Sequence, residues 1–210
     1  MATRAGRRTH DPFASVLSDV TNKPKYVNMA DINLAAPKSQ AAAAKVGTAP
    51  AADEPQWDII ELLFFAYRDF VGDPDHVLET LAFGRAHHRV LHFVNRNPGM
   101  KVADLLDILR ITKQSLGRVL KQLVDEGYVI QKEGAVDRRQ RLLYVTEKGE
   151  ALALRLARLQ TARIDRALES VGPGAGEAAR KFLAAVIDPE ARESVLTFID
   201  RANRARRPRG

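Results

Sequence analysis

Polar and basic side chains gather on one face of a segment near the middle of the chain. Within residues 113–126 apolar residues recur every three or four positions, which predicts a helix with one buried stripe. The opposite face carries the residues that have the chemistry to contact nucleic acid: Lys113, Gln114, Ser115, Gly117, Arg118 and Lys121. Glutamine pairs with adenine edges and arginine with guanine edges, while serine and lysine suit phosphates and glycine permits close backbone approach. The same composition also fits an ordinary solvated helix face.

The start of this helix adds to the predicted interface. Thr112 is a good N-cap residue, so we expect the helix to begin directly after it. Backbone N–H groups and the helix dipole at such a start favour phosphate.

A second basic cluster follows in a predicted hairpin loop. Asp137, Arg138 and Arg139 lie between two β-rich runs, at the expected tip of the hairpin. Adjacent guanidiniums repel one another in solvent, but the negative potential of a DNA minor groove attracts them. Asp137 is then expected to orient a guanidinium, either that of Arg139 or that of Arg118. The alternative interpretation is that this cluster is only an exposed charged turn. The basic helix directly before the hairpin favours the DNA-binding interpretation over it.

Three histidines are the remaining candidates for a chemical site. His88 and His92 are four residues apart on a predicted helix, with His87 beside them, but no third ligand is near in sequence. The chain has no cysteine, no phosphate-binding glycine loop and no nucleophile motif. We therefore expect no metal, no cofactor and no enzymatic activity, and we take the histidines as structural or surface residues.

Helices and a hairpin are predicted to position these residues. A short helix at 101–109, the turn Arg110-Ile111 and the helix 113–126 form a helix-turn-helix that ends at Gly127. From Tyr128 the apolar period changes from helical spacing to two, which predicts the hairpin.

Further helices flank this unit. Before it we expect an amphipathic helix over 56–71 that ends at Gly72-Asp73-Pro74, a short helical segment over 75–81, and a helix that closes at Asn97-Pro98-Gly99. After it, Thr146 caps a long helix that ends at Gly172, with its arginines, Arg163 among them, largely outward. A final helical pair is broken at Asp188-Pro189.

The domain organisation follows from these elements. The fold class is mainly α with a small β-hairpin wing, a winged helix-turn-helix core between N- and C-terminal dimerisation helices. The predicted parts are an N-terminal arm with an Ala-rich linker at 1–54, dimerisation helices at 55–82, the winged core at 83–149, the long and C-terminal helices at 150–204, and a basic tail at 205–210. The apolar residues of the arm leave it open whether the arm docks or stays disordered.

Composition narrows the class of partner. The chain has 210 residues with 45% hydrophobic and 28% charged residues, typical of one globular domain with appendages. Lys and Arg number 33 against 26 Asp and Glu, and the net charge of +7 favours an anionic partner. No segment approaches the ~20 apolar residues needed to span a bilayer. We expect a cytoplasmic protein without a membrane partner.

The order of these features resembles the winged-helix core of the MarR family of bacterial transcription regulators. The matching residues are Ser115, Arg118, Leu123, Gly127, Tyr128, Val129, Asp137, Arg139, Thr146 and Gly149. The resemblance implies that Arg139 enters the minor groove while Gln114, Ser115 and Arg118 work in the major groove. It also implies a dimer formed by the helices 56–71 and 175–204, and a small-molecule effector site bordered by His87 or His88. The family often has a small or acidic residue at the position of Lys121.

Two functions from different classes follow. The first is a homodimeric regulator that binds double-stranded DNA at a pseudo-palindromic operator through Thr112, the helix 113–126 and the wing. The second is a winged-helix protein-interaction module that binds an acidic partner. The terminal helices carry more apolar surface than one winged-helix core can cover. Uncovered apolar surface of this kind usually marks an interface, which is a physical argument for the dimer that is independent of the resemblance.

Overall fold

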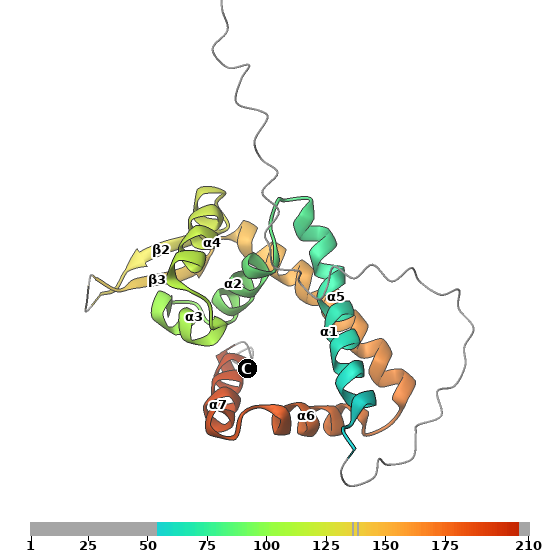
Figure 1. Ribbon diagram of the computed structural model, residues 1–210. Coiled ribbons are helices and arrows are strands. Elements are labelled where there is room, and N and C mark those ends of the chain that lie inside the picture. The colour runs from blue at the N-terminus through green and yellow to red at the C-terminus, as the bar shows by residue number, and fades with distance from the viewer. Residues whose placement is uncertain (1–53, 136, 138, 206–210) are drawn as a thin grey trace, which may run out of the picture. The chain divides into compact units, whose positions relative to one another are not determined.

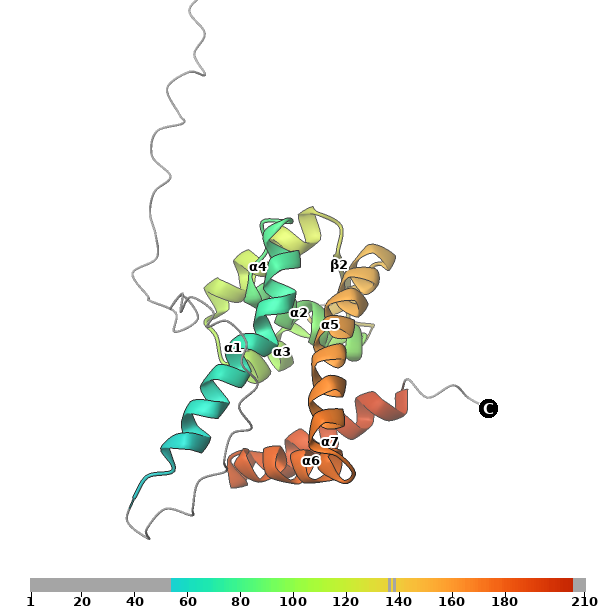
Figure 2. The same ribbon diagram turned by 90° about the vertical axis from the view of Figure 1, so that its right-hand side faces the viewer.

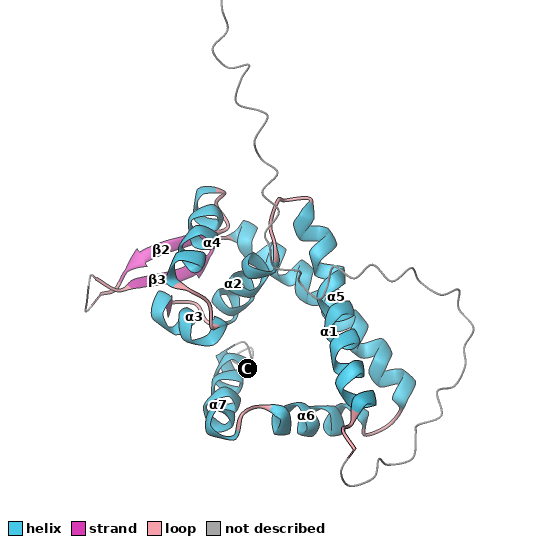
Figure 3. Cartoon of the chain, viewed as in Figure 1, coloured by secondary structure: helices cyan, strands magenta, loops and turns pink. Residues whose placement is uncertain are grey.

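A computed structural model describes residues 54–135, 137 and 139–205, all within the compact unit Pro50–Gly210. Our predictions for the arm at 1–53, for Arg138 and for the basic tail from residue 206 lie outside the described residues. Helices dominate the described part, with one small sheet (Figure 3). The elements are, in order along the chain, α1 (Trp57–Glu79), α2 (Arg85–Arg96), β1 (Met100–Lys101), α3 (Val102–Leu109), α4 (Lys113–Asp125), β2 (Val129–Glu133), β3 (Arg141–Val145), α5 (Glu147–Val171), α6 (Ala175–Val186) and α7 (Pro189–Ala205).

The core lies where α2, α3, α4, the sheet and the first turns of α5 meet (Figure 1). Each of these elements contributes apolar side chains that are essentially removed from solvent: Val90, Leu91, Leu105, Leu116, Leu123, Leu143 and Leu156. Burial of a side chain of this size stabilises a fold by about 1.5–3 kcal/mol. The predicted winged helix-turn-helix unit is thus the best packed part of the molecule.

The sheet contains one strand more than predicted. Its order is β1-β3-β2, all antiparallel, with Met100 opposite Leu143 and Gln131 also opposite Leu143. The sequence predicted only the β2–β3 hairpin because β1 spans two residues, too short to show a period. This strand joins the end of α2 to the wing and so fixes the sheet against the helices.

Helix α1 corrects the predicted helix break. It runs without interruption through Gly72, Asp73 and Pro74, although a proline inside a helix removes one backbone hydrogen bond. Packing holds both sides together, because Pro74 and Leu78 are buried and Arg163 of α5 donates two hydrogen bonds of 3.0 Å to Asp73. These tertiary contacts outweigh the local signal for a break.

The same ion pair corrects the predicted direction of Arg163. Its guanidinium faces α1 rather than solvent, and it lowers the pKa of Asp73 below the usual value. Helices α1 and α5 contact one another over part of their length and diverge toward the start of α1, while α6 and α7 follow the end of α5 (Figure 2). In the described residues no helix is long and apolar enough to cross a membrane.

Candidate nucleic-acid interface

Helix α4 begins as the sequence predicted. The backbone N–H of Ser115 donates to Oγ1 of Thr112 at 3.1 Å, which satisfies one donor of the first turn. The Thr112 hydroxyl in turn donates to the Ser115 Oγ at 2.9 Å. Arg110, just before the cap, has a φ of 52°, a left-handed conformation that ends α3 sharply. The two helices therefore meet at a tight turn, and the start of α4 is fixed.

All six predicted contact residues of α4 are exposed, and its apolar stripe is buried in the core: Leu116, Val119, Leu120 and Leu123. Lys113, Gln114 and Arg118 form no hydrogen bond or ion pair with any residue that the structure describes. Ser115 is engaged with the cap, and Lys121 pairs with Asp125 one turn later. Three polar side chains of the helix thus remain available to an external partner.

Gly117 lies in the middle of the exposed face. A methyl group added there meets nothing within 4 Å, so packing among the described residues does not require glycine. Glycine in a helix interior costs about 1 kcal/mol relative to alanine. Nothing in the part of the chain that the structure describes accounts for a glycine at this position.

The wing is an antiparallel hairpin of two five-residue strands, in register from Val129 opposite Val145 to Glu133 opposite Arg141. Its loop is closed by backbone bonds from Gly134 to Gln140 at 3.0 Å and from Gln140 to Asp137 at 3.0 Å. A side chain at Gly134 would come within 2.7 Å of the Asp137 carbonyl oxygen, so the tight loop needs glycine there. The hairpin projects away from the helices (Figure 1).

Asp137 plays a different part from the predicted one. Its carboxylate accepts a hydrogen bond of 2.9 Å from the backbone N–H of Arg139, and it makes no ion pair with the guanidinium of Arg139 or Arg118. An aspartate two residues before an amide closes an Asx turn, which competes with the more distant guanidiniums. Asp137 therefore shapes the loop, and the side chain of Arg139 stays exposed.

The structure adds one residue that the sequence did not indicate. Arg110 is exposed and stands two residues before the cap of α4. The left-handed conformation of Arg110 is usually adopted by glycine or asparagine. In the sequence, only its position directly after an apolar helix could have indicated that Arg110 ends this helix. An additional cation therefore stands near the start of α4.

His87 links α2 to the helix α4. Its Nδ1 accepts from the Gly84 N–H at 3.1 Å, so the ring proton lies on Nε2, which donates to Oε1 of Gln122 at 2.9 Å. The ring stacks on Phe83 at a centroid distance of 4.7 Å. Burial lowers the pKa of His87 below its ordinary value, against the opposing effect of the Gln122 bond. The neutral ring therefore fits this position.

His88 faces the interior between α1 and α2 and is 8% exposed. Burial lowers its pKa, and the carboxylate of Asp75 acts in the opposite direction. Across residues 54–135, 137 and 139–205 no group of three or more histidines, aspartates or glutamates is arranged to hold a metal ion.

A small cavity of about 210 Å³ lies beside His88, between α1, α2 and α5. Aromatic and basic side chains dominate its lining: Tyr67, Phe70, Val71, His88, Arg89, His92, Phe93 and Gln160. His87, in contrast, is absent from this lining.

Comparison with known proteins identifies the family. The sequence model of the MarR family matches residues 83–140, from Phe83 through the wing loop. The HTH-type transcriptional regulator PetP of Rhodobacter capsulatus is 47% identical over 133 residues, which cover 63% of this chain and 80% of PetP. The chain belongs to the MarR family of transcriptional regulators. The predicted winged helix-turn-helix fold and the predicted family are thereby confirmed.

Solved structures of the MarR family share the fold. Streptococcus pneumoniae FabT in complex with DNA superposes with a TM-score of 0.57 at 16% identity, covering 63% of this chain and 94% of FabT. NadR in complex with 4-hydroxyphenylacetate gives a TM-score of 0.54 at 21% identity, covering 67% of this chain and 100% of NadR. At these identities the likeness concerns the arrangement of the elements, which is that of a MarR regulator.

Proposed function

We propose that this MarR regulator binds double-stranded DNA as a homodimer and recognises a pseudo-palindromic operator with α4 and the wing. The observation that carries the proposal is the exposed face of α4, on which Lys113, Gln114 and Arg118 have no partner within the described chain. A capped helix start and an unexplained glycine on the same face support it. FabT, which shares the fold, was solved in complex with DNA.

Residue roles follow from chemistry and position. Gln114 and Arg118 would contact base edges in the major groove, whereas Thr112, Lys113, Ser115 and Lys121 would contact phosphates. Gly117 would allow close approach. Asp137 would hold the loop so that Arg139, with Arg138 beside it in sequence, reaches the minor groove.

The dimer is proposed from apolar surface that one chain leaves uncovered. On α1, Trp57 is 59% exposed and Leu62 65%, and on α6 Leu183 is 57% exposed. Exposed apolar patches of this kind usually mark an interface. A two-fold dimer would place its paired α4 helices about 34 Å apart, one turn of DNA, so each half of the operator would be bound by one chain. A chromosomal DNA target would require the protein to be in the cytoplasm.

We also propose that a small-molecule effector binds the cavity beside His88. NadR shares the fold and was solved with 4-hydroxyphenylacetate, a small aromatic acid. The cavity between α1, α2 and α5 joins the proposed dimer helices to the DNA-binding core, so an occupant would influence both. Calorimetric titration with 4-hydroxyphenylacetate, in wild type and in His88→Leu, tests this site, and equal heats from both proteins would exclude it.

A fluorescence titration with fragments of the source genome tests the DNA-binding proposal. We expect at least one fragment to bind far more tightly than random DNA of equal length, and the affinity to fall steeply as salt rises because counterions are released from phosphates. Equal affinity for all fragments would contradict an operator-specific regulator. Absence of DNA binding together with capture of an acidic protein would favour the interaction module instead.

A further inference from the structure

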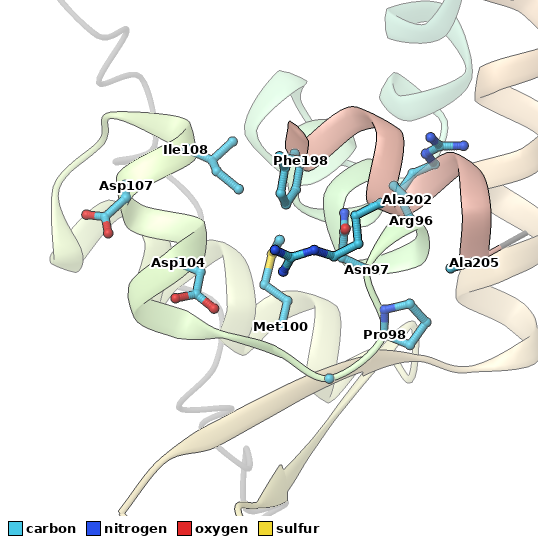
Figure 4. A pocket seen from close by; sticks show the side chains of 12 residues that line it. Arg96, Asn97, Pro98, Met100, Asp104, Asp107, Ile108, Phe198, Ala202 and Ala205 are labelled. Carbon is cyan, nitrogen blue, oxygen red and sulfur yellow. The ribbon is translucent and has the colours of Figure 1, made fainter. Parts of the chain in front are cut away.

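A larger cavity lies between α7 and the helix-turn-helix, away from the effector cavity beside His88. It measures about 580 Å³, which is within the usual range of small-molecule sites. The C-terminal helix α7 supplies one wall, and α3 with the loop after α2 supplies the other (Figure 4). No role of α4 or of the wing uses this space.

The interior of the cavity is apolar. Met100 is 6% exposed and Ala202 3%, while Phe198 and Ile108 are partly buried at its centre. Figure 4 shows Ile108 and Phe198 pointing toward one another from the two walls. Phe198 also contacts Phe93 of α2, with ring centroids 6.2 Å apart, which anchors α7 to the core. An apolar group of a ligand would therefore meet a preformed surface.

Charged groups of both signs surround this surface. Arg201 of α7 is exposed and makes no hydrogen bond or ion pair with any described residue. On the opposite wall, α3 presents the carboxylates of Asp104 and Asp107. Asp104 accepts one weak bond of 3.3 Å from the Lys101 N–H, and Asp107 has no partner among residues 54–135, 137 and 139–205. Arg96 is already bonded to Asn203 at 2.6 Å.

We propose that this cavity binds a small zwitterion with an apolar side group, the chemical class of the hydrophobic α-amino acids. The ligand carboxylate would pair with Arg201 and its ammonium with Asp104 and Asp107, while the side group would pack on Phe198, Ile108 and Met100. A simple anion leaves the two aspartates facing a negative charge, and a simple cation faces Arg201, so each is disfavoured. Only a ligand with both charges satisfies both walls.

Isothermal titration calorimetry of the purified full chain with L-phenylalanine, without DNA, tests this proposal. We expect saturable binding to wild type, and binding weaker by about tenfold or more in Arg201→Gln and in the double variant Asp104→Asn/Asp107→Asn, since each loses charge-assisted hydrogen bonds. Asparagine at position 104 retains the capping bond to Lys101, so α3 should stay folded. Arg204→Gln and Asp200→Asn, on α7 but outside the cavity lining, should bind as wild type does.

Three results would overturn the proposal. The first is no binding of L-phenylalanine or L-leucine at millimolar concentration, which would mean that Arg201 faces the two aspartates without an intervening ligand. The second is equal binding by wild type and Arg201→Gln. The third is binding of 3-phenylpropionate or phenethylamine as tightly as phenylalanine, which would exclude a zwitterion site. Because the measurement contains no DNA, its failure would leave the proposed operator binding untouched.

Discussion

Single residues decide between structural and functional explanations of the α4 face. Leu116 and Leu123 are fixed by packing, since each is almost fully buried. Packing does not fix the identity of Gly117, because a Cβ atom built at this position meets no atom within 4 Å. Where packing within the chain does not explain a residue, its substitution can change DNA affinity without lowering the stability of the fold.

Gly117→Ala should separate the two directly. The substitution should raise the free energy of unfolding by about 1 kcal/mol, because alanine is the better helix former and meets no neighbour. It should weaken DNA binding about tenfold or more, since the added methyl group crowds the duplex. Urea unfolding and a DNA titration of the same sample measure both effects.

Gly72→Ala is the matched control. Gly72 is also inside a helix with nothing within 4 Å, but on α1. It should stabilise the protein and leave DNA affinity unchanged. Unchanged DNA affinity in Gly117→Ala would mean that α4 does not approach the duplex closely at this residue.

His87 predicts a pH dependence of stability. Its pKa is lowered in the folded chain, so the unfolded chain binds more protons, and stability is present above the ordinary histidine pKa of about 6.5 and is lost as the pH falls below it. We expect the free energy of unfolding to decrease between about pH 7.5 and pH 5.5, and to decrease less in His87→Gln. Urea unfolding at both pH values checks this difference. Identical pH dependence in the two proteins would show that His87 is not held neutral.

At the scale of elements, local signals predicted the ends of helices well. Thr112 and Thr146 cap α4 and α5, with bonds of 3.1 Å from Ser115 and Gly149, and Gly127 ends α4 with a φ of 74°. Local signals failed where distant residues decide. The Asp73–Arg163 contact joins positions 90 apart in sequence and carries α1 through Pro74, and β1 exists only because β3 lies beside it.

The cap of α4 gives a test at this scale. Thr112→Ala removes the acceptor for the Ser115 N–H, and we expect the free energy of unfolding to fall by about 1 kcal/mol. Thr112→Ser keeps the hydroxyl and should stay within a few tenths of a kcal/mol of wild type. Urea unfolding of the three proteins measures the difference. Equal losses in both variants would mean that the cap bond is not what starts the helix.

At the scale of the molecule, the candidate site was predicted more completely than its surroundings. The exposed residues of α4 and the wing follow from period and turn chemistry, which a single sequence contains. The position of α7 against α2, and so beside α3, does not follow from the sequence in this way, because it depends on a few long-range contacts such as Phe93 with Phe198 and Arg96 with Asn203. The cavity beneath α7 therefore had no signal in the sequence. The exposed apolar residues on α1 and α6 are the basis of the proposed dimer.

The dimer is tested by Leu62→Glu. Leu62 is 65% exposed on α1, so a charge there costs the single chain little but would be buried without a partner in the proposed interface. We expect wild type to have the mass of a dimer in light scattering and Leu62→Glu that of a monomer. Ile130→Glu, at an apolar residue of the wing that is 40% exposed, should remain a dimer. A monomeric wild type, or a dimeric Leu62→Glu, would contradict the proposed interface.

The affinity of Arg139→Ala for an operator fragment tests the central claim most directly. Arg139 is exposed on a loop held by Asp137, so its loss should leave the melting temperature unchanged. DNA affinity should fall about tenfold or more, because a minor-groove contact is lost, whereas Arg158→Ala, exposed on α5, should bind like wild type. Wild-type affinity in Arg139→Ala, with its fold intact, would contradict DNA recognition by the wing.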